Sequence, residues 1–205
     1  EGRSRPAREG ITIQEGDRVL TEANSQAEIS LGAYSRIDVD DFSEVVFDEI
    51  GMKEEGKTIS TVFHRSGICW YKMVYTSKDE RYRVLTSTAN VTVAGSGADF
   101  LVDVQAEAVR IHNTDGLLLV ERPDGEEAVN LIAGQTALVY NDGRPIQVRT
   151  LAADVSPNER FSQLMKEKTN YMMRFMPLNF LFCGPANTYY LVSVQFDKGD
   201  RKSTR

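Results

Sequence analysis

From about Gly10 to Leu151 the chain consists of short segments in which apolar and polar residues alternate, and Gly, Asp and Asn residues separate these segments. Successive side chains of a β-strand point to opposite faces of a sheet, so alternation over roughly four to eight residues is typical of a strand with one buried face. Turn residues recur about every 8 to 12 residues, which is typical of all-β domains. The pattern therefore predicts a mainly β fold.

The alternation places the expected strands and the turns between them. The expected strands are residues 27–31, 37–39, 45–50, 58–63, 68–75, 82–86, 91–93, 100–104, 109–111 and 117–119. Residues 64–67, 113–116, 122–125 and 141–143 are expected to separate or end strands, because Gly accepts φ > 0 without steric cost. Gly95 and Gly97 lack the Lys and the following helix of a phosphate loop, so we expect a bulge or sharp corner there.

The pattern changes after Leu151. Ser156-Pro157-Asn158-Glu159 is a capping box that predicts a helix ending at Pro177. A final strand is expected from Tyr189 to Phe196. The predicted organisation is a disordered arm at 1–9, a β domain at 10–152 and a helix-strand appendage at 153–205.

Charge and hydropathy exclude two classes of partner. The net charge of −6 disfavours nucleic acid, whose binding depends on Lys and Arg neutralising phosphates. The basic residues near both ends are expected to lie in solvated tails. The longest apolar stretch, Met172 to Cys183, contains Arg174, Pro177 and Asn179 and is far shorter than the roughly 20 residues of a membrane span. No transmembrane segment is expected.

Residues that carry chemistry are few. His64 and His112 lie beside predicted turns, and we expect them to be exposed loop residues. The acidic group Asp38, Asp40, Asp41, Asp48 and Glu49 lacks the pattern of a calcium loop and is expected to form a solvated rim. The sequence therefore predicts no catalytic residue, no metal ligand and no cofactor.

The cysteines and a serine give no nucleophile. Ser96 lies between Gly95 and Gly97, but a strand rather than a helix is expected to follow it, unlike a nucleophile elbow. Cys69 is expected to pack inside a strand. Whether Cys69 pairs with Cys183 or both are separate buried thiols is left open.

Apolar residues are unusually dense around the end of the expected helix. Either this segment folds back on the β body as core, which we favour, or part of it is a partner surface, for which flexible Met is well suited. The candidate partner-binding residues are Met172, Phe175, Phe180 and Phe182.

Several motifs, taken in order, resemble the FecR domain, the extracytoplasmic module of bacterial cell-surface signalling regulators. The resemblance runs from about Gly16 to Asn141 and is carried by Gly16-Asp17-Arg18-Val19-Leu20-Thr21, Asn24-Ser25-Gln26-Ala27-Glu28-Ile29, Ser35-Arg36-Ile37, Gly67-Ile68-Cys69-Trp70-Tyr71 and Arg83-Val84-Leu85-Thr86-Ser87-Thr88-Ala89-Asn90-Val91. One departure is Gly97-Ala98-Asp99-Phe100, where the family has Gly-Thr-x-Phe.

This resemblance implies a β-solenoid-like body or a twisted β-sandwich, between which the periodicity does not choose. It also implies a periplasmic or other extracytoplasmic location. Regulators of this family add a cytoplasmic helical segment and a membrane helix, so we expect this chain to correspond to the sensor module alone.

Two functions are weighed. The first is a non-enzymatic cell-envelope module that binds another protein, in signalling (FecR-like sensing or anti-sigma regulation) or in envelope organisation. The alternative is a carbohydrate or peptidoglycan binding module, because aromatic faces stack on sugars; core packing is the competing interpretation for Trp70. The aromatic residues concerned are Trp70, Tyr71, Tyr75, Tyr82 and the pair Tyr189-Tyr190.

Overall fold

The computed structural model describes residues 6–31, 34–54, 57–75, 78–150 and 192–196, and this part of the chain is β-sheet and connecting turns with no helix. The mainly β prediction is confirmed. The strands are β1 (Arg18–Leu20), β2 (Ser25–Leu31), β3 (Ser35–Val39), β4 (Glu44–Glu54), β5 (Lys57–Val74), β6 (Glu80–Leu85), β7 (Asn90–Val104), β8 (Ala108–Glu121), β9 (Ala128–Ile132), β10 (Gln135–Tyr140), β11 (Gln147–Thr150) and β12 (Val192–Phe196).

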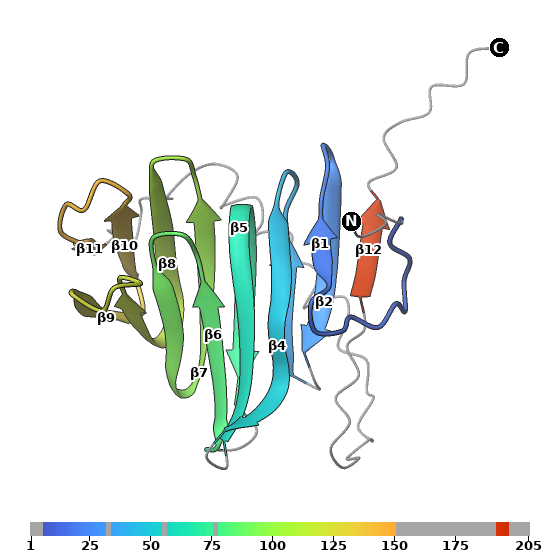
Figure 1. Cartoon of the computed structure of the whole chain (residues 1–205), viewed down its shortest axis with the longest axis horizontal. Helices are drawn as coiled ribbons and strands as arrows, with labels where there is room; N and C mark the ends of the chain where they lie inside the picture. Colours follow the sequence, from blue (N-terminus) through green and yellow to red (C-terminus); the bar gives the residue numbers. More distant parts are fainter. Residues whose placement is uncertain (1–5, 32–33, 55–56, 76–77, 151–191, 197–205) are drawn as a thin grey trace. The chain divides into compact units, whose positions relative to one another are not determined.

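All of these strands belong to one continuous open sheet (Figure 1). The order along its main path is β11-β10-β8-β7-β6-β5-β3-β2-β12, while β1 and β4 branch from β5 and β9 branches from β8. The pairings among β1 to β10 and β12 are antiparallel, except that of β5 with β6, which is parallel.

The three longest strands take part in two different halves of the sheet. The first part of β5 lies between β4 and β6, and its second part lies between β3 and β7. The strands β7 and β8 change neighbours in the same way, since β8 pairs first with β10 and then with β9. We call the part containing β4, β6 and β9 the β6 half, and the part containing β2, β3 and β10 the β3 half.

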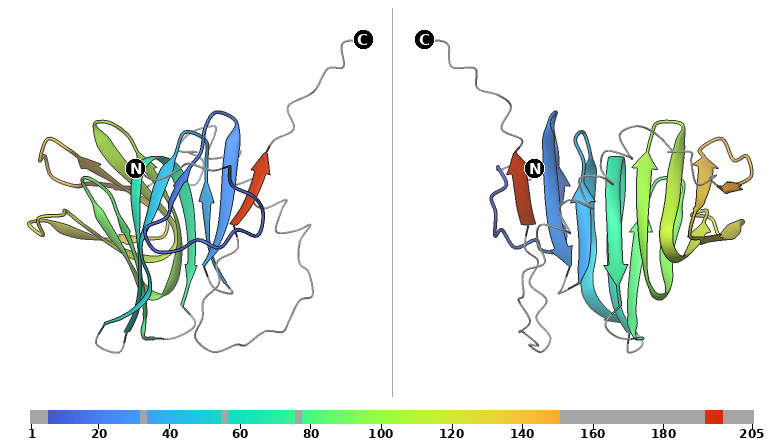
Figure 2. Two further views of the ribbon diagram at one scale, coloured as in Figure 1. Left: turned by 45° about the vertical axis from the view of Figure 1, so that its right-hand side comes forward. Right: turned by 180° about the vertical axis from the view of Figure 1, so that it is seen from behind.

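The short connection between β5 and β6 requires the two halves to face each other. The parallel register places Glu80 of β6 opposite Thr58 near the start of β5. Residues 75–79, which connect Val74 to Glu80, span at most about 20 Å, whereas a straight strand from Thr58 to Val74 would measure about 50 Å. β5 must therefore bend until its ends approach each other, and the turned views in Figure 2 show this curvature of the sheet.

The bend of β5 occurs at Gly67, where φ is +83°. A Cβ at this position would lie 2.6 Å from the Cα of Ser43 and 2.7 Å from the carbonyl oxygen of Phe42, so only glycine fits. β7 shows a register shift between Ala94 and Ala98, which confirms the bulge predicted at Gly95 and Gly97. The predicted strand breaks at 64–67 and 113–116 are wrong, because both segments lie inside continuous strands.

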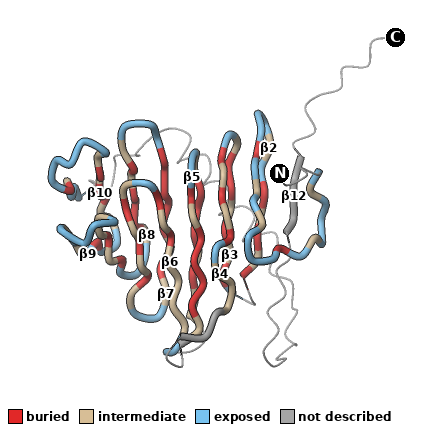
Figure 3. Tube along the Cα trace, viewed as in Figure 1, coloured by how far each residue is buried: buried red, intermediate tan, exposed pale blue. Residues whose placement is uncertain are grey.

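One apolar core lies between the two halves. β5 is buried along most of its length (Figure 3), and its Tyr71 ring stacks on Phe100 of β7 with centroids 5.2 Å apart. Cys69 is fully buried, as expected. The largest buried apolar side chains come from both halves and are Tyr71, Phe47, Phe100, Ile29, Ile37, Met73, Ile111, Leu118 and Leu131.

Tyr75 joins the halves where β5 ends. Its hydroxyl donates a hydrogen bond to the Val93 carbonyl at 2.8 Å and accepts one from the Tyr82 amide at 3.1 Å. The Tyr75 ring also stacks on the Tyr82 ring, with centroids 5.4 Å apart. These contacts hold the end of β5 against β6 and the first part of β7.

The prediction of exposed histidines is wrong for both residues. His64 lies within β5 on the buried face and His112 within β8, and both are buried. The His64 Nε2 lies 3.1 Å from the Ser66 carbonyl, and Nδ1 has no hydrogen-bond partner. Burial lowers the pKa of His64 to about 4. The alternation of strand 58–63 simply continues through His64.

Most of the predicted C-terminal appendage lies outside the described residues, including the expected helix at 156–177. The five residues of β12 fall within the expected final strand and pair with β2. Among the described residues, β12 belongs to the same compact unit as the chain from residue 6 to residue 149. No helix that could cross a membrane was found in the described part of the chain.

Gly67→Ala tests the bend. We expect it to lower the free energy of unfolding by about 3 kcal/mol, because a Cβ meets backbone atoms and φ stays positive. Gly125→Ala is the matched control, since Gly125 has φ +74° but nothing within 4 Å of a Cβ, and we expect a loss of about 1 kcal/mol. Urea denaturation measures both. Equal losses would contradict the bend as the critical constraint.

His64 should make stability depend on pH. The folded chain keeps His64 neutral down to about pH 4, whereas the unfolded chain binds a proton below its ordinary pKa of about 6.5. Acidification through this window therefore favours the unfolded state, by roughly 3 kcal/mol at its lower end. His64→Gln should show a smaller loss between pH 7 and pH 4.5 in urea titrations. An unchanged slope would exclude His64 as the cause.

Candidate functional site

The first motif of the chain positions a turn and a short strand against β4. The Gly16 amide donates to the Phe47 carbonyl at 2.7 Å, and the Phe47 amide donates to the Asp17 carbonyl at 2.9 Å. The Asp17 carboxylate accepts the Gln14 amide at 2.8 Å. These bonds fix β1 along β4, where Leu20 pairs with Glu44. Gly16 and Asp17 are therefore structural residues.

Thr21, the last residue of this motif, joins two loops that lie far apart in sequence. Its hydroxyl donates to the Asp40 carbonyl at 2.5 Å and accepts the Ser43 amide at 2.9 Å. Its own amide donates to the Ser43 carbonyl at 3.0 Å. The threonine thus holds the turn between β3 and β4 beside the end of β1.

The same turn is fixed from its other side by β5. The Ser43 hydroxyl accepts the Ile68 amide at 2.9 Å, and the Asp40 amide donates to the Ile68 carbonyl at 2.9 Å. The Phe42 carbonyl faces Gly67, where no side chain intervenes. A turn tied to two neighbours by this many bonds has little freedom to relax.

This braced turn presents two large apolar side chains to solvent. Phe42 is 65% exposed and Leu20 is 57% exposed, and with Thr21, Glu22 and Ala23 they line one shallow hollow. We call it the Leu20–Phe42 surface. An exposed apolar patch on a rigid support is suited to bind an apolar side chain of another protein.

The backbone of Phe42 strengthens this interpretation. Its φ is +52°, in the left-handed region that costs a bulky residue of order 1 kcal/mol. Asn24, close to the same hollow, also has a positive φ, but Asn tolerates that conformation well. Phe42 therefore has two energetically unfavourable features in the described structure: its left-handed backbone conformation and its solvent-exposed ring. Such a cost is typical of a residue kept for binding.

The acidic group predicted as a solvated rim is only partly so. Asp40 is buried and accepts a hydrogen bond from Gln26 at 3.1 Å. Asp38 forms an ion pair with Arg36 at 3.0 Å. Asp41 is half-buried and Asp48 is exposed. The exposed carboxylate of Glu22 adds negative charge beside the Leu20–Phe42 surface.

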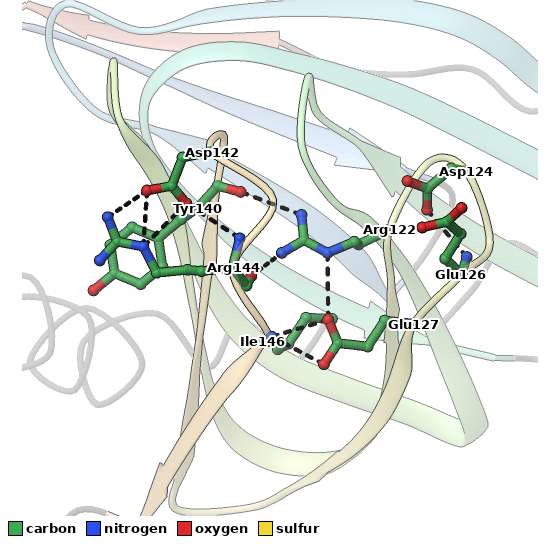
Figure 4. Close-up of polar contacts among 8 residues, drawn as sticks. All are labelled: Arg122, Asp124, Glu126, Glu127, Tyr140, Asp142, Arg144 and Ile146. Carbon is green, nitrogen blue, oxygen red and sulfur yellow. Dashed lines mark hydrogen bonds and ion pairs between the residues drawn. The ribbon is translucent and has the colours of Figure 1, made fainter.

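The second polar constellation joins the turns after β8 and β10 (Figure 4). Arg122 donates to the Glu127 carboxylate at 3.3 Å, to the Tyr140 carbonyl at 3.2 Å and to the Arg144 carbonyl. Glu127 in turn accepts the Ile146 amide at 3.0 Å. The charges are matched internally, so we interpret this cluster as a clamp between the two halves at this edge.

The exposed residues of this clamp also interact with one another. The Arg144 guanidinium pairs with Asp142 and lies over the Tyr140 ring, 4.0 Å from its centroid (Figure 4). Hydrogen bonding to Arg144 lowers the pKa of Asp142. The charged groups of this cluster therefore pair mainly with one another.

Metal and nucleophile sites do not form among the described residues. No three His, Cys, Asp or Glu side chains in the described ranges are placed to hold a metal ion. Burial raises the pKa of the Cys69 thiol, which keeps it protonated and unreactive. Cys183 lies outside the described residues, so the question of pairing stays open.

The described aromatic residues considered for sugar stacking face the interior or one another. Trp70 is buried and donates to the Asp99 carboxylate, which fits the core-packing interpretation. Tyr71 is buried against Phe100, and Tyr75 stacks on Tyr82. Trp70 and Tyr71 are thus core residues, and Tyr75 and Tyr82 are partly buried against the core. The pair Tyr189-Tyr190 lies outside the described residues.

The predicted partner-binding residues Met172, Phe175, Phe180 and Phe182 also lie outside the described residues and stay a prediction. Sequence reasoning missed the Leu20–Phe42 surface. The available signal was an apolar Phe inside Asp40-Asp41-Phe42-Ser43, a segment that otherwise reads as a polar turn.

Comparison with solved structures supports the fold. Two crystal structures of a candidate anti-sigma factor from Parabacteroides distasonis ATCC 8503 are similar to this chain, with TM-scores of 0.54 and 0.55 at 16% and 17% sequence identity. Each match covers 67% of this chain and 61% of the other. The chain thus spans less than two thirds of the length of these structural neighbours. At such identity the likeness shows a shared fold.

Comparison of sequences adds nothing further. No protein-family model and no curated protein matches the chain.

Phe42→Asn tests whether the Leu20–Phe42 surface lowers the stability of the fold. Asn accepts the left-handed backbone, so we expect the free energy of unfolding to rise by about 1 kcal/mol. Leu20→Ser is the control, because it removes a neighbouring exposed apolar group without changing strain, and we expect it to stay within about 0.5 kcal/mol of the unmodified chain. Urea denaturation compares them. If Phe42→Asn lowered the free energy of unfolding, the claim that the backbone of Phe42 is strained would be wrong.

Proposed function

We propose that this chain is a FecR-like sensing module of an anti-sigma-type signalling protein, that it acts outside the cytoplasm, and that it binds another cell-envelope protein through the Leu20–Phe42 surface. The observation that carries the proposal is Phe42, which is exposed, conformationally unfavourable and held rigidly by Thr21, Ser43 and Gly67.

Three further observations support the proposal. The described chain shares its fold with a protein described as a candidate anti-sigma factor. The motif Gly16-Asp17-Arg18-Val19-Leu20-Thr21, which carries part of the FecR resemblance, builds the support of the surface. The described residues provide no metal-ligating cluster and no accessible thiol. A role in recognising a protein fits these observations better than a role in catalysis.

The strength of such a contact can be bounded. Burying a Phe or Leu side chain contributes about 1.5 to 3 kcal/mol, and a rigid support avoids the cost of ordering a loop on binding. Because the turn is preformed, we expect the partner to meet it without rearrangement of β3 or β4.

Photo-crosslinking in the source cell tests the proposal. Benzoylphenylalanine at position 42 or 20 should give one discrete adduct with an envelope protein, since both positions line the same hollow. Ile132, which is 55% exposed on β9, is the matched control position and should give no such adduct. Phe42→Asn should reduce capture of the identified partner at least tenfold.

Two outcomes would reject the proposal. One is the absence of an adduct from positions 20 and 42, or the same adduct from position 132. The other is an adduct formed with a cytoplasmic protein, which would reject the extracytoplasmic location.

A further inference from the structure

The edge of the β3 half is formed by β2 and a strand from the far end of the chain. In the described sheet β2 pairs with β3 on one side and with β12 on the other. The β12 register places Val192 opposite Ile29, Val194 opposite Ala27 and Phe196 opposite Ser25. Without β12, the amide and carbonyl groups along one side of β2 would form an open sheet edge.

The pairing of β12 is weakly enforced by the covalent chain. Ile29 and its partner Val192 are about 160 residues apart in the sequence, and a strand pairing of such high sequence separation gains little from the covalent connection. The described β12 is five residues long and pairs with Ser25 to Ile29 of β2, so the pairing that has to be displaced is short. An extended segment from another protein can therefore compete with it.

The open edge would continue into the Leu20–Phe42 surface. β12 runs antiparallel to β2 and reaches Ser25 at its own C-terminal end. A longer strand in the same register would next pass Asn24 and Ala23, and Ala23 lines the hollow with Leu20 and Phe42. One extended peptide can thus pair with β2 and reach the apolar surface.

Charge selects the chemistry of this peptide. The exposed carboxylate of Glu22 lies in the lining of the hollow, so basic groups are favoured there. The sequence that follows β12 has an excess of positive charge, with Lys198, Arg201, Lys202 and Arg205 against Asp197 and Asp200. We therefore expect the peptide that pairs with β2 to have alternating apolar residues followed by basic residues.

We propose that β2 is a strand-accepting edge, to which an extended segment of the partner adds in place of β12, with apolar residues opposite Ala27 and Ile29 and basic residues beyond Ser25. This inference rests on the proposed function, because it assigns the chemistry of the partner that meets the Leu20–Phe42 surface. Backbone pairing supplies affinity in this mode, and alternate side chains supply specificity.

A disulfide lock in the full chain tests exchange at this edge. Glu28 and Ser193 are directly opposite each other in β2 and β12, so Glu28→Cys with Ser193→Cys should bridge them. Cys183→Ser leaves Cys69, which is fully buried, as the only native cysteine. Oxidation should reduce formation of the position-42 adduct at least tenfold, and reduction should restore it. The single variant Glu28→Cys in the same background is the control. An adduct unaffected by oxidation would overturn the proposal.

A peptide assay gives an independent measure. The probe is a fluorescent peptide with the sequence of residues 190–205. Val192→Asp with Val194→Asp in the full chain places charge opposite Ile29 and Ala27, which should displace β12 and increase peptide affinity at least tenfold over the unmodified chain. The same two changes in the peptide should abolish its binding, and the oxidised lock should bind no peptide. Equal binding to the locked and unlocked chains would overturn strand exchange.

The outcomes separate the two proposals. Adducts from positions 20 and 42 that persist in the oxidised lock would keep the proposed function and reject strand addition. Failure of the adducts in the unlocked chain, together with peptide binding at β2, would reject the Leu20–Phe42 contact and keep β2 as an accepting edge.

Discussion

The bend of β5 at Gly67 is the constraint on which the rest of this structure depends. Because β6 returns in parallel beside the start of β5, the strand has to double back within its own length, and the two halves of the sheet then enclose one core. The same glycine allows the turn at Phe42 and Ser43 to approach β5 directly. The core and the candidate binding surface are therefore produced by one backbone feature.

The Leu20–Phe42 surface follows from this arrangement through a chain of hydrogen bonds. Ser43 can bond to Ile68 because Gly67 leaves room for it, and Thr21 can bond to Ser43 because β1 lies along β4. The backbone at Phe42 is thereby held between Thr21 on one side and Gly67 on the other. Thr21, the last residue of a motif that resembles the FecR family, contributes here by positioning the turn that contains Phe42.

Much of the fold could be predicted from alternation alone, because strands such as β2 and β3 bury alternate residues. What alternation could not show was which glycines end strands and which bend them. Gly67 and Gly116 have the same positive φ as the turn residue Gly125, so local conformation does not separate the cases; only strand pairing does. The error on His64 has the same origin, since a turn was expected where the strand continued.

The candidate site was less accessible to sequence reasoning. Leu20 and Phe42 are distant along the chain and become neighbours only through Thr21, a contact that no periodicity encodes. The aromatic residues that attracted a carbohydrate hypothesis were misleading for a related reason, because Trp70 and Tyr71 alternate across a strand that is buried on both faces. Exposure depends on what covers each face, which is a tertiary property.

The pairing of β12 with β2 joins the two parts of the sheet that are most distant in the polypeptide. Contacts of such high sequence separation form late, because their loop entropy is overcome only after the local structure exists. As a ribosome makes a chain from its N-terminus, β2 and the whole bent sheet can be complete before β12 has been synthesised. A newly made molecule thus passes through a period in which this border of the sheet has no intramolecular neighbour.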